Sequence, residues 1–129
     1  MQGLVRLPAP QGIAAMQSIN LVVLNRAFLG AFLGTAAGCA VVVFGSLLRW
    51  GRLGAVYLFV GGMAYLVGTF LVTMMFNAPK NDALALVRSD DPQSAAVWTH
   101  YVAVWTAWNH VRTAAAFAAA VALSLALAF

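Results

Sequence analysis

The sequence predicts an all-α membrane bundle with three transmembrane helices and short interfacial helices, forming one domain over residues 1–129. Hydrophobic residues make up 64% of the chain and charged residues 8%, which is too apolar for the surface of a soluble domain of this length. Residues 27–48 and 53–76 carry no charge, and each stretch exceeds the ~20 residues needed to cross a bilayer. The last stretch, 114–129, is also uncharged.

The helices are expected in this order: an interfacial helix at 10–24, transmembrane helices at 27–48 and 54–77, a short helix at 79–88, and a long transmembrane helix at 93–128. Ile13 and Met16 lie at helical spacing in the first of these. The short link "RWGR" (49–52) makes the first two spans an antiparallel hairpin. Because Pro79 disfavours a continuing helix, the second span should end near Ala78.

The last helix begins after "DDP", where Asp91 suits a cap and Pro92 suits the first helical position. A continuous helix from there to the C-terminus would be ~55 Å long, which exceeds the thickness of a bilayer. Its first four turns must therefore tilt, lie at the interface or project beyond it. Trp98 and Tyr101 are expected in an aromatic belt at that interface.

Glycines recur at regular spacing on the first two spans. Gly30, Gly34 and Gly38 share one helical face, and Gly61 and Gly68 share a face of the second span. Small residues in register let membrane helices approach closely. The pattern favours packing within the chain, with dimer formation as the alternative.

Composition also excludes several function classes. The net charge of +4 comes from scattered Arg and Lys residues against three Asp residues, so it indicates contact with anionic lipid and no nucleic-acid binding. Cys39 is the single cysteine, which excludes an intrachain disulfide and a cysteine metal cluster. Because the first two spans contain no charged residue, ion transport is disfavoured.

The stretch "VWTAWNHVRT" (104–113) carries the first candidate site residues. On a helix, Trp105, Trp108, Asn109 and Arg112 share one broad face, whereas His110 points away from it. Polar groups at membrane depth usually face the bundle interior. The face therefore predicts a pocket wall rich in hydrogen-bond donors. The alternative is an arginine that reaches to water or phosphate from near a helix end.

A second polar cluster, "FNAPKND", follows the second span. Because that span ends where the third begins, Asn77 and Asn81 are expected at the same membrane edge as Asn109 and Arg112, facing the arginine. The alternative role for the two asparagines is helix capping.

Three segments, "LPAPQGIAAMQSIN", "YLVGTFLVTMMFNAPKNDALA" and "VWTAWNHVRT", resemble the anthrone oxygenase-like family of small membrane proteins. The resemblance covers residues 7–127. Its most specific elements are N-x-P-x-N (77–81) and W-N-x-x-R (108–112). The family implies a further apolar helix at the start, in whose place this chain has "MQGLVR".

The resemblance implies oxidation of an anthrone, a flat phenolic ketone, to an anthraquinone by O2. No metal, flavin or other cofactor is expected, because the anthrone anion reacts with O2 directly. The implied catalytic residues are Arg112 and Asn109 at the oxyanion and His110 as a base; the implied binding residues are Asn77, Asn81, Trp105 and Trp108, with Phe76 beside the rings.

The competing interpretation is a non-catalytic membrane subunit that packs against a larger complex or a second copy of itself. Both interpretations place the chain as a multi-pass protein in a bacterial inner membrane, in contact with lipid. They differ in whether the polar face of the last helix holds a hydrophobic aromatic ligand.

Overall fold

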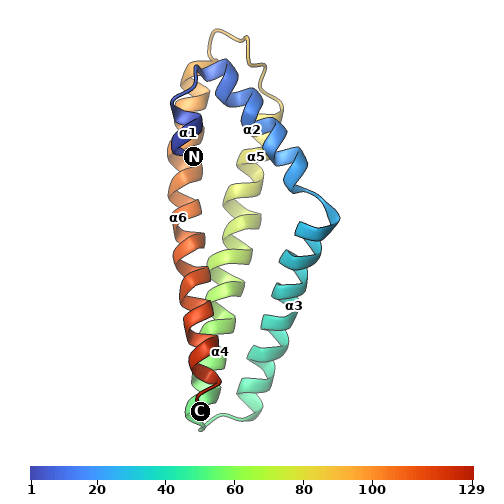
Figure 1. The fold of residues 1–129 in the computed structure, drawn as a ribbon, viewed down its shortest axis with the longest axis vertical. Coiled ribbons are helices and arrows are strands. Elements are labelled where there is room, and N and C mark those ends of the chain that lie inside the picture. The colour runs from blue at the N-terminus through green and yellow to red at the C-terminus, as the bar shows by residue number, and fades with distance from the viewer.

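Every regular element of the protein is a helix, which confirms the predicted all-α bundle (Figure 1). The computed structural model describes residues 1–129. Its elements are α1 (Gln2–Val5), α2 (Ala9–Val23), α3 (Arg26–Leu48), α4 (Leu53–Tyr65), the π-helical segments η1 (Leu66–Leu71) and η2 (Thr73–Asn77), α5 (Ala78–Ala85) and α6 (Ser94–Ala126). The short helix α1 lies in a stretch where no helix was expected.

The second long helix does not end near Ala78, contrary to the expectation from Pro79. It runs without a break from Leu53 to Ala85. The backbone N–H of Ala78 bonds to the carbonyl of Thr73, five residues earlier, which is the π-helical pattern. The wider π turns that precede the proline provide the local adjustment through which a helix accommodates its ring and missing N–H.

Helix α4 and segment η1 pack antiparallel to α6, and glycines permit their close approach. A Cβ atom added at Gly61 would lie 2.8 Å from Leu123 Cγ, and one at Gly68 would overlap the methyl group of Ala115. These two glycines therefore pack within the chain, as the small-residue pattern predicts for neighbouring membrane helices.

The glycines of α3 behave differently, and the expectation of packing within the chain is wrong for them. Added Cβ atoms at Gly30, Gly34 and Gly38 would meet nothing within 4 Å. Helix α3 contacts α4 through its other face, where Gly62 lies against Val43, and it stands apart from α6 (Figure 1). The glycine face of α3 is left open because a single neighbour covers only one side of a helix.

We call the region formed by α1, α2, α5 and the first turns of α6 the cap. Its core consists of Ile13, Met16, Leu84, Trp98 and Tyr101, all buried. The two aromatic residues are therefore core residues of the cap and do not form the expected interfacial belt. The reason is α2, which packs against the first turns of α6 and places Gly12 against the Trp98 ring.

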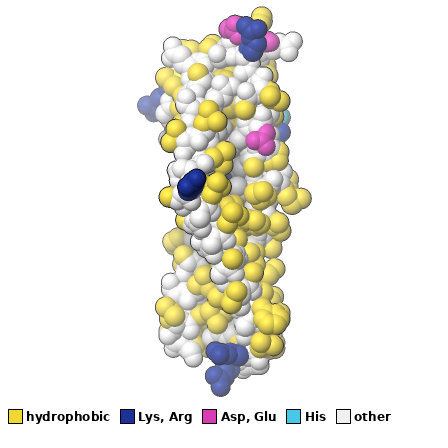
Figure 2. All heavy atoms as spheres, turned by 90° about the vertical axis from the view of Figure 1, so that its right-hand side faces the viewer, with side chains coloured by type: hydrophobic (Ala, Val, Ile, Leu, Met, Phe, Trp, Pro, Cys, Tyr) yellow, Lys and Arg dark blue, Asp and Glu magenta, His cyan; other side chains and the backbone are white.

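Charged side chains and long apolar helices are distributed unevenly along the long axis of the molecule. Helices Arg26–Leu48 and Leu53–Ala85 are long and apolar enough to cross a membrane by length and composition. Figure 2 shows Lys and Arg side chains at both ends of the molecule and also near mid-height, Asp side chains in one half only, and a surface without charged side chains between mid-height and the lower end. Asp91 accepts a hydrogen bond from the Gln93 backbone N–H just before α6 begins.

Candidate functional site

The two predicted asparagines bond to α6 and do not cap helices. The Asn77 side chain is buried, and its Nδ2 donates to the backbone carbonyl of Trp105 at 3.2 Å. The Tyr101 hydroxyl donates to Asn81 Oδ1 at 2.7 Å. These bonds tie the end of the second long helix to α6 from inside the bundle.

Arg112 lies deeper than this turn, so the expected contact between Arg112 and residues 77–81 is absent. The Thr69 hydroxyl donates to the Arg112 carbonyl at 3.3 Å, which places Arg112 two turns of α6 below Trp105 and Asn77. In two antiparallel helices packed side by side, a step forward along one helix corresponds to a step back along the other. Since Asn77 is level with Trp105, the residue level with Arg112 lies about two turns earlier in the second long helix, at Thr69. Tyr65 lies near Arg112, and its hydroxyl donates to the carbonyl of Phe32 in α3 at 3.2 Å.

The interior beside α6 holds several buried polar atoms with no hydrogen-bond partner in the protein. They are Asn20 Nδ2, Asn77 Oδ1, Trp105 Nε1, Thr106 Oγ1 and Arg112 Nε. Leaving one such group buried and unpaired costs about 1–3 kcal/mol. Native proteins keep few of them, and each calls for an explanation such as a ligand or a solvent molecule.

The part of the second long helix that faces these atoms is π-helical. Segments η1 and η2 contact α6, and they include Thr69 and Asn77, the residues that bond to it. π-helical turns are rare and occur frequently at functional sites. The irregular backbone therefore coincides with the unpartnered polar atoms.

Helix α2 contributes residues that were not predicted for the site. Gln17 Nε2 donates to the carbonyls of Leu84 and Val87, at 2.8 and 3.0 Å. Asn20 lies beside the Tyr101 hydroxyl. The sequence signal was available, because residues 17 and 20 share a helical face with the apolar residues 13 and 16.

Comparison with known proteins bears directly on this region. A family model described as anthrone oxygenase matches residues 23–122. The chain belongs to the anthrone oxygenase family. No curated protein and no solved structure matches it. The matched residues of this anthrone oxygenase family member include the π-helical segments and the polar face of α6, and exclude Gln17 and Asn20.

Two residues expected to serve the anthrone oxygenase site lie in other surroundings. Trp108 stacks on Phe76 with ring centroids 3.7 Å apart and planes within 6°, so these two rings contact each other and leave no gap for a substrate between them. His110 is exposed and forms no side-chain hydrogen bond, because it points to the side of α6 opposite Arg112. Asn109 is half-buried between the levels of Trp105 and Arg112.

Neither of two surface pockets, each about 390 Å³, is lined by a tryptophan, Asn109 or Arg112. The aromatic residues of α6 instead stack in sequence: the centroids of Trp98 and Tyr101 are 5.8 Å apart, and those of Tyr101 and Trp105 are 6.4 Å apart. In this anthrone oxygenase family member the two pockets therefore do not coincide with the polar face of α6.

Because of Tyr101, the free energy of unfolding should depend on pH in the alkaline range. Burial raises its pKa from 10.0 to about 12, against the smaller opposing effect of the Asn20 amide. Since the unfolded chain releases this proton first, stability should fall as the pH rises from about 10 to about 12. Tyr101→Phe should be less stable at pH 8, through loss of the bond to Asn81, yet lose less stability between those two pH values. Thermal unfolding followed by circular dichroism across this range would measure how steeply the stability of each protein falls with pH. Equal slopes for the unmodified protein and Tyr101→Phe would contradict the assignment.

Proposed function

We propose that this chain is an integral membrane protein that oxidises a flat, lipophilic phenolic ketone of the anthrone type with O2. The substrate would lie inside the bundle, against the face of α6 between Trp105 and Arg112. The observation that carries the proposal is the group of buried polar atoms without partners on and opposite this face. Membership in the anthrone oxygenase family supports the reaction type.

We propose three membrane spans: α3, the helix from Leu53 to about Asn77, and the second half of α6. The third span is supported by packing, because α6 runs beside the second long helix from Gly54, near Phe129, to Gly68 of η1, near Ala115. If the helix Leu53–Ala85 crosses the membrane, the part of α6 packed along it lies in the membrane as well. The cap would then lie outside the hydrocarbon, with Arg49 and Arg52 at the opposite surface, in what we take to be a bacterial inner membrane.

The reaction requires little beyond stabilisation of an anion. An anthrone loses a proton from its methylene carbon to give a delocalised aromatic oxyanion, and this electron-rich anion reacts with O2. One oxygen atom remains as the new carbonyl of the anthraquinone, and the other leaves as water with the two methylene hydrogens. Hydrogen-bond donors aimed at the oxyanion in a dry interior would stabilise it and so promote both proton loss and oxidation.

The unpartnered donors suit this role. Trp105 and Arg112 are seven residues apart on one helical face, a rise of about 10 Å, and Asn109 lies between them on the same face. Arg112 carries a permanent positive charge, so it would give the strongest stabilisation of an anion. With His110 facing outward, the proton would pass to water and not to that imidazole.

Replacement of Trp105 with phenylalanine tests the proposal. The change removes an indole N–H that has no partner in the protein and keeps an aromatic ring, so the unfolding temperature should change little. Loss of one hydrogen bond to the reacting oxygen should slow anthrone oxidation about tenfold. The assay follows O2 uptake and anthraquinone absorbance with purified protein in lipid nanodiscs.

Trp98→Phe is the matched control, because Trp98 is buried in the core of the cap, two turns away. It should lower stability through lost packing and leave the rate of oxidation nearly unchanged. A Trp105→Phe protein that oxidises anthrone at the unmodified rate would remove Trp105 from the site. An unmodified chain that shows no oxidation above the rate without protein would refute the enzymatic function.

A second candidate function is that of a non-catalytic subunit that packs against another copy or a larger membrane complex. One observation favours it: the open face of Gly30, Gly34 and Gly38 on α3, which nothing in the chain covers. Such a stripe lets another transmembrane helix approach closely. The two candidates are compatible if a partner helix covers α3 while the interior beside α6 binds the substrate.

A further inference from the structure

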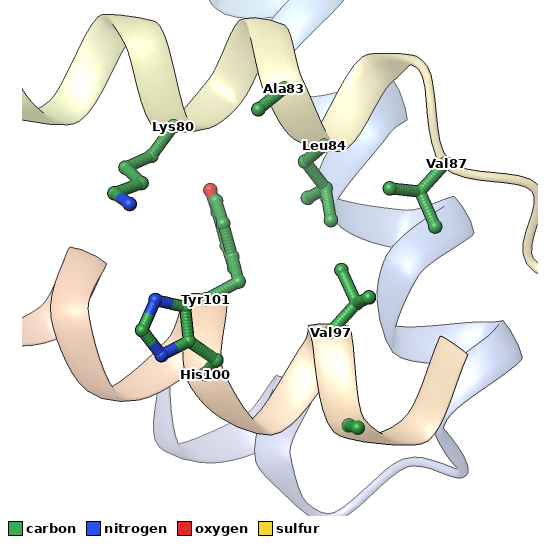
Figure 3. A pocket seen from close by; sticks show the side chains of 8 residues that line it. Lys80, Ala83, Leu84, Val87, Val97, His100 and Tyr101 are labelled. Carbon is green, nitrogen blue, oxygen red and sulfur yellow. The ribbon is translucent and has the colours of Figure 1, made fainter. Parts of the chain in front are cut away.

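The more polar of the two surface pockets has a feature that the proposed reaction does not use. It lies on the outer side of the cap, between α5 and the first turns of α6, and has a volume of about 390 Å³ (Figure 3). Tyr101 forms one of its walls. The unpartnered atoms of Asn77, Trp105 and Arg112 belong to residues that do not line it.

The pocket is polar at one end and apolar at the other. Figure 3 shows Lys80 of α5 and His100 of α6 at one end, and Val87 and Val97 at the opposite end, with Leu84 between. Six of the eight lining residues are hydrophobic, so the wall has few groups that could neutralise a charge.

Lys80 is a cation without an ionic partner. The ion pair of the structure joins Arg88 to Asp90, and Asp91 bonds to the Gln93 backbone. Lys80 is half-buried, and Figure 3 shows its amine between α5 and α6, at the same end of the pocket as His100. An ammonium group at the end of an apolar pocket favours an anionic ligand group at that point.

We propose that this pocket binds a free amphiphilic carboxylate, with the acid group at Lys80 and His100 and the apolar body against Leu84, Val87 and Val97. Lys80 supplies the charge and up to three N–H donors, and His100 adds a ring N–H. The apolar wall contributes through burial of the ligand body.

The direction of the pocket distinguishes a free carboxylate from a bilayer phospholipid. Lys80 and His100 are nearer the spans than Val87 and Val97, because α5 leads away from the second span and α6 returns towards the third (Figure 1). With the membrane placement proposed above, an acid group at Lys80 directs the ligand body away from the hydrocarbon. A phospholipid in the bilayer has the opposite polarity, with its chains directed into the hydrocarbon.

The second surface pocket provides a matched comparison. It has the same volume of about 390 Å³, lies between α4 and α6, and is lined by eight hydrophobic residues, including Val60 and Val121. Since it has no charged lining residue, it should not distinguish a carboxylate from a neutral ligand of the same shape.

Photolabelling tests the proposal with the full chain in phosphatidylcholine nanodiscs. The probe is benzophenone-4-carboxylate, its neutral counterpart is benzophenone-4-carboxamide, and mass spectrometry locates the labelled peptides. We expect the carboxylate to label the pocket between α5 and α6, and the carboxamide to label it about tenfold less, as loss of a charge-assisted hydrogen bond predicts. Equal labelling by the two probes would overturn the proposal.

Substitutions distinguish the effect of the lysine charge from the effect of the shape of the pocket. Lys80→Met should reduce carboxylate labelling about tenfold, and Lys80→Arg should retain most of it. Val97→Trp should fill the pocket and abolish labelling there, whereas Val121→Trp, in the apolar pocket, should leave it unchanged. Undiminished labelling of the Lys80→Met protein would refute the role of the lysine.

Lys80 is the only lysine of the chain, which permits a separate readout. Acetylation by an N-hydroxysuccinimide ester modifies this side chain and the N-terminal amine, so modification at Lys80 reports its accessibility. Benzophenone-4-carboxylate should protect Lys80, and adding phosphatidylglycerol to the nanodiscs should not. If phosphatidylglycerol protects Lys80 as strongly as the carboxylate, the site binds membrane lipid and the proposal of a free ligand is wrong. None of these measurements depends on anthrone oxidation.

Discussion

Arg112→Ala should lower the rate of anthrone oxidation by about 10²–10³-fold, the usual loss for one donor to an oxyanion. The buried Nε of Arg112 has no partner in the protein, so its stabilising interaction is expected with the substrate anion. The fold should persist, because Thr69 bonds to the backbone carbonyl of Arg112 and not to its side chain. O2 uptake and thermal unfolding, measured on the same nanodisc preparation, would show whether activity and stability separate.

Two further variants make this test specific. Arg112→Lys keeps the charge but loses the planar fork, so it should recover only a small part of the rate. His110→Ala, two residues away on the exposed side of α6, should oxidise anthrone at nearly the unmodified rate. A normal rate for Arg112→Ala, or a large loss for His110→Ala, would contradict the site as assigned.

The bound ligand offers a direct measure of the same effect. If Arg112 stabilises the oxyanion, bound anthrone should ionise at a lower pH than free anthrone, and Arg112→Ala should remove that difference. The absorbance of the anion, titrated without O2, gives both values. Ionisation at the same pH in the free and bound states would show that the arginine has another role.

Gly68→Val should destabilise the bundle by about 1–3 kcal/mol, as overpacking does in well-packed interiors. A side chain at this position would overlap the methyl group of Ala115 and push α6 away from the π-helical segment. The same substitution at Gly38, where nothing lies within 4 Å, should have only the small effect of helix propensity. Thermal unfolding of both variants in one detergent measures the difference.

The Gly38→Val variant also tests self-association. If another copy packs on the glycine face of α3, this variant should dissociate to monomers while remaining folded, as measured by mass determination in detergent. If it unfolds as readily as Gly68→Val, the packing assigned to α3 is wrong.

Much of the fold was predictable because helix formation and membrane partition depend on local composition. The first long helix, expected at 27–48, is Arg26–Leu48 in the structure, and the last, expected at 93–128, is Ser94–Ala126. The helical phase that separated His110 from Arg112 also follows from sequence, because a regular helix turns by a constant angle. The break expected near Ala78 failed because π turns accommodate a proline, and sequence did not reveal those turns.

Pairings between helices were not predictable in the same way. Asn77 and Arg112 were expected to meet because both lie near one end of the bundle, yet Asn77 is level with Trp105. The register between two helices depends on which side chains fit between them, as where Ala115 lies against Gly68. The order and direction of helices along the chain do not predict an axial offset of two turns between residues on neighbouring helices.

The sequence by itself determined the all-α class, two apolar helices of membrane-spanning length, the anthrone oxygenase family, and the polar face of the last helix. Only the tertiary structure decided which glycines pack within the chain, which aromatic residues form the core of the cap, and which polar atoms remain without partners. The physical reason is the distance along the sequence over which each property is determined. Hydropathy and helical phase are properties of neighbouring residues, whereas burial and hydrogen bonding depend on a second segment that packing brings alongside.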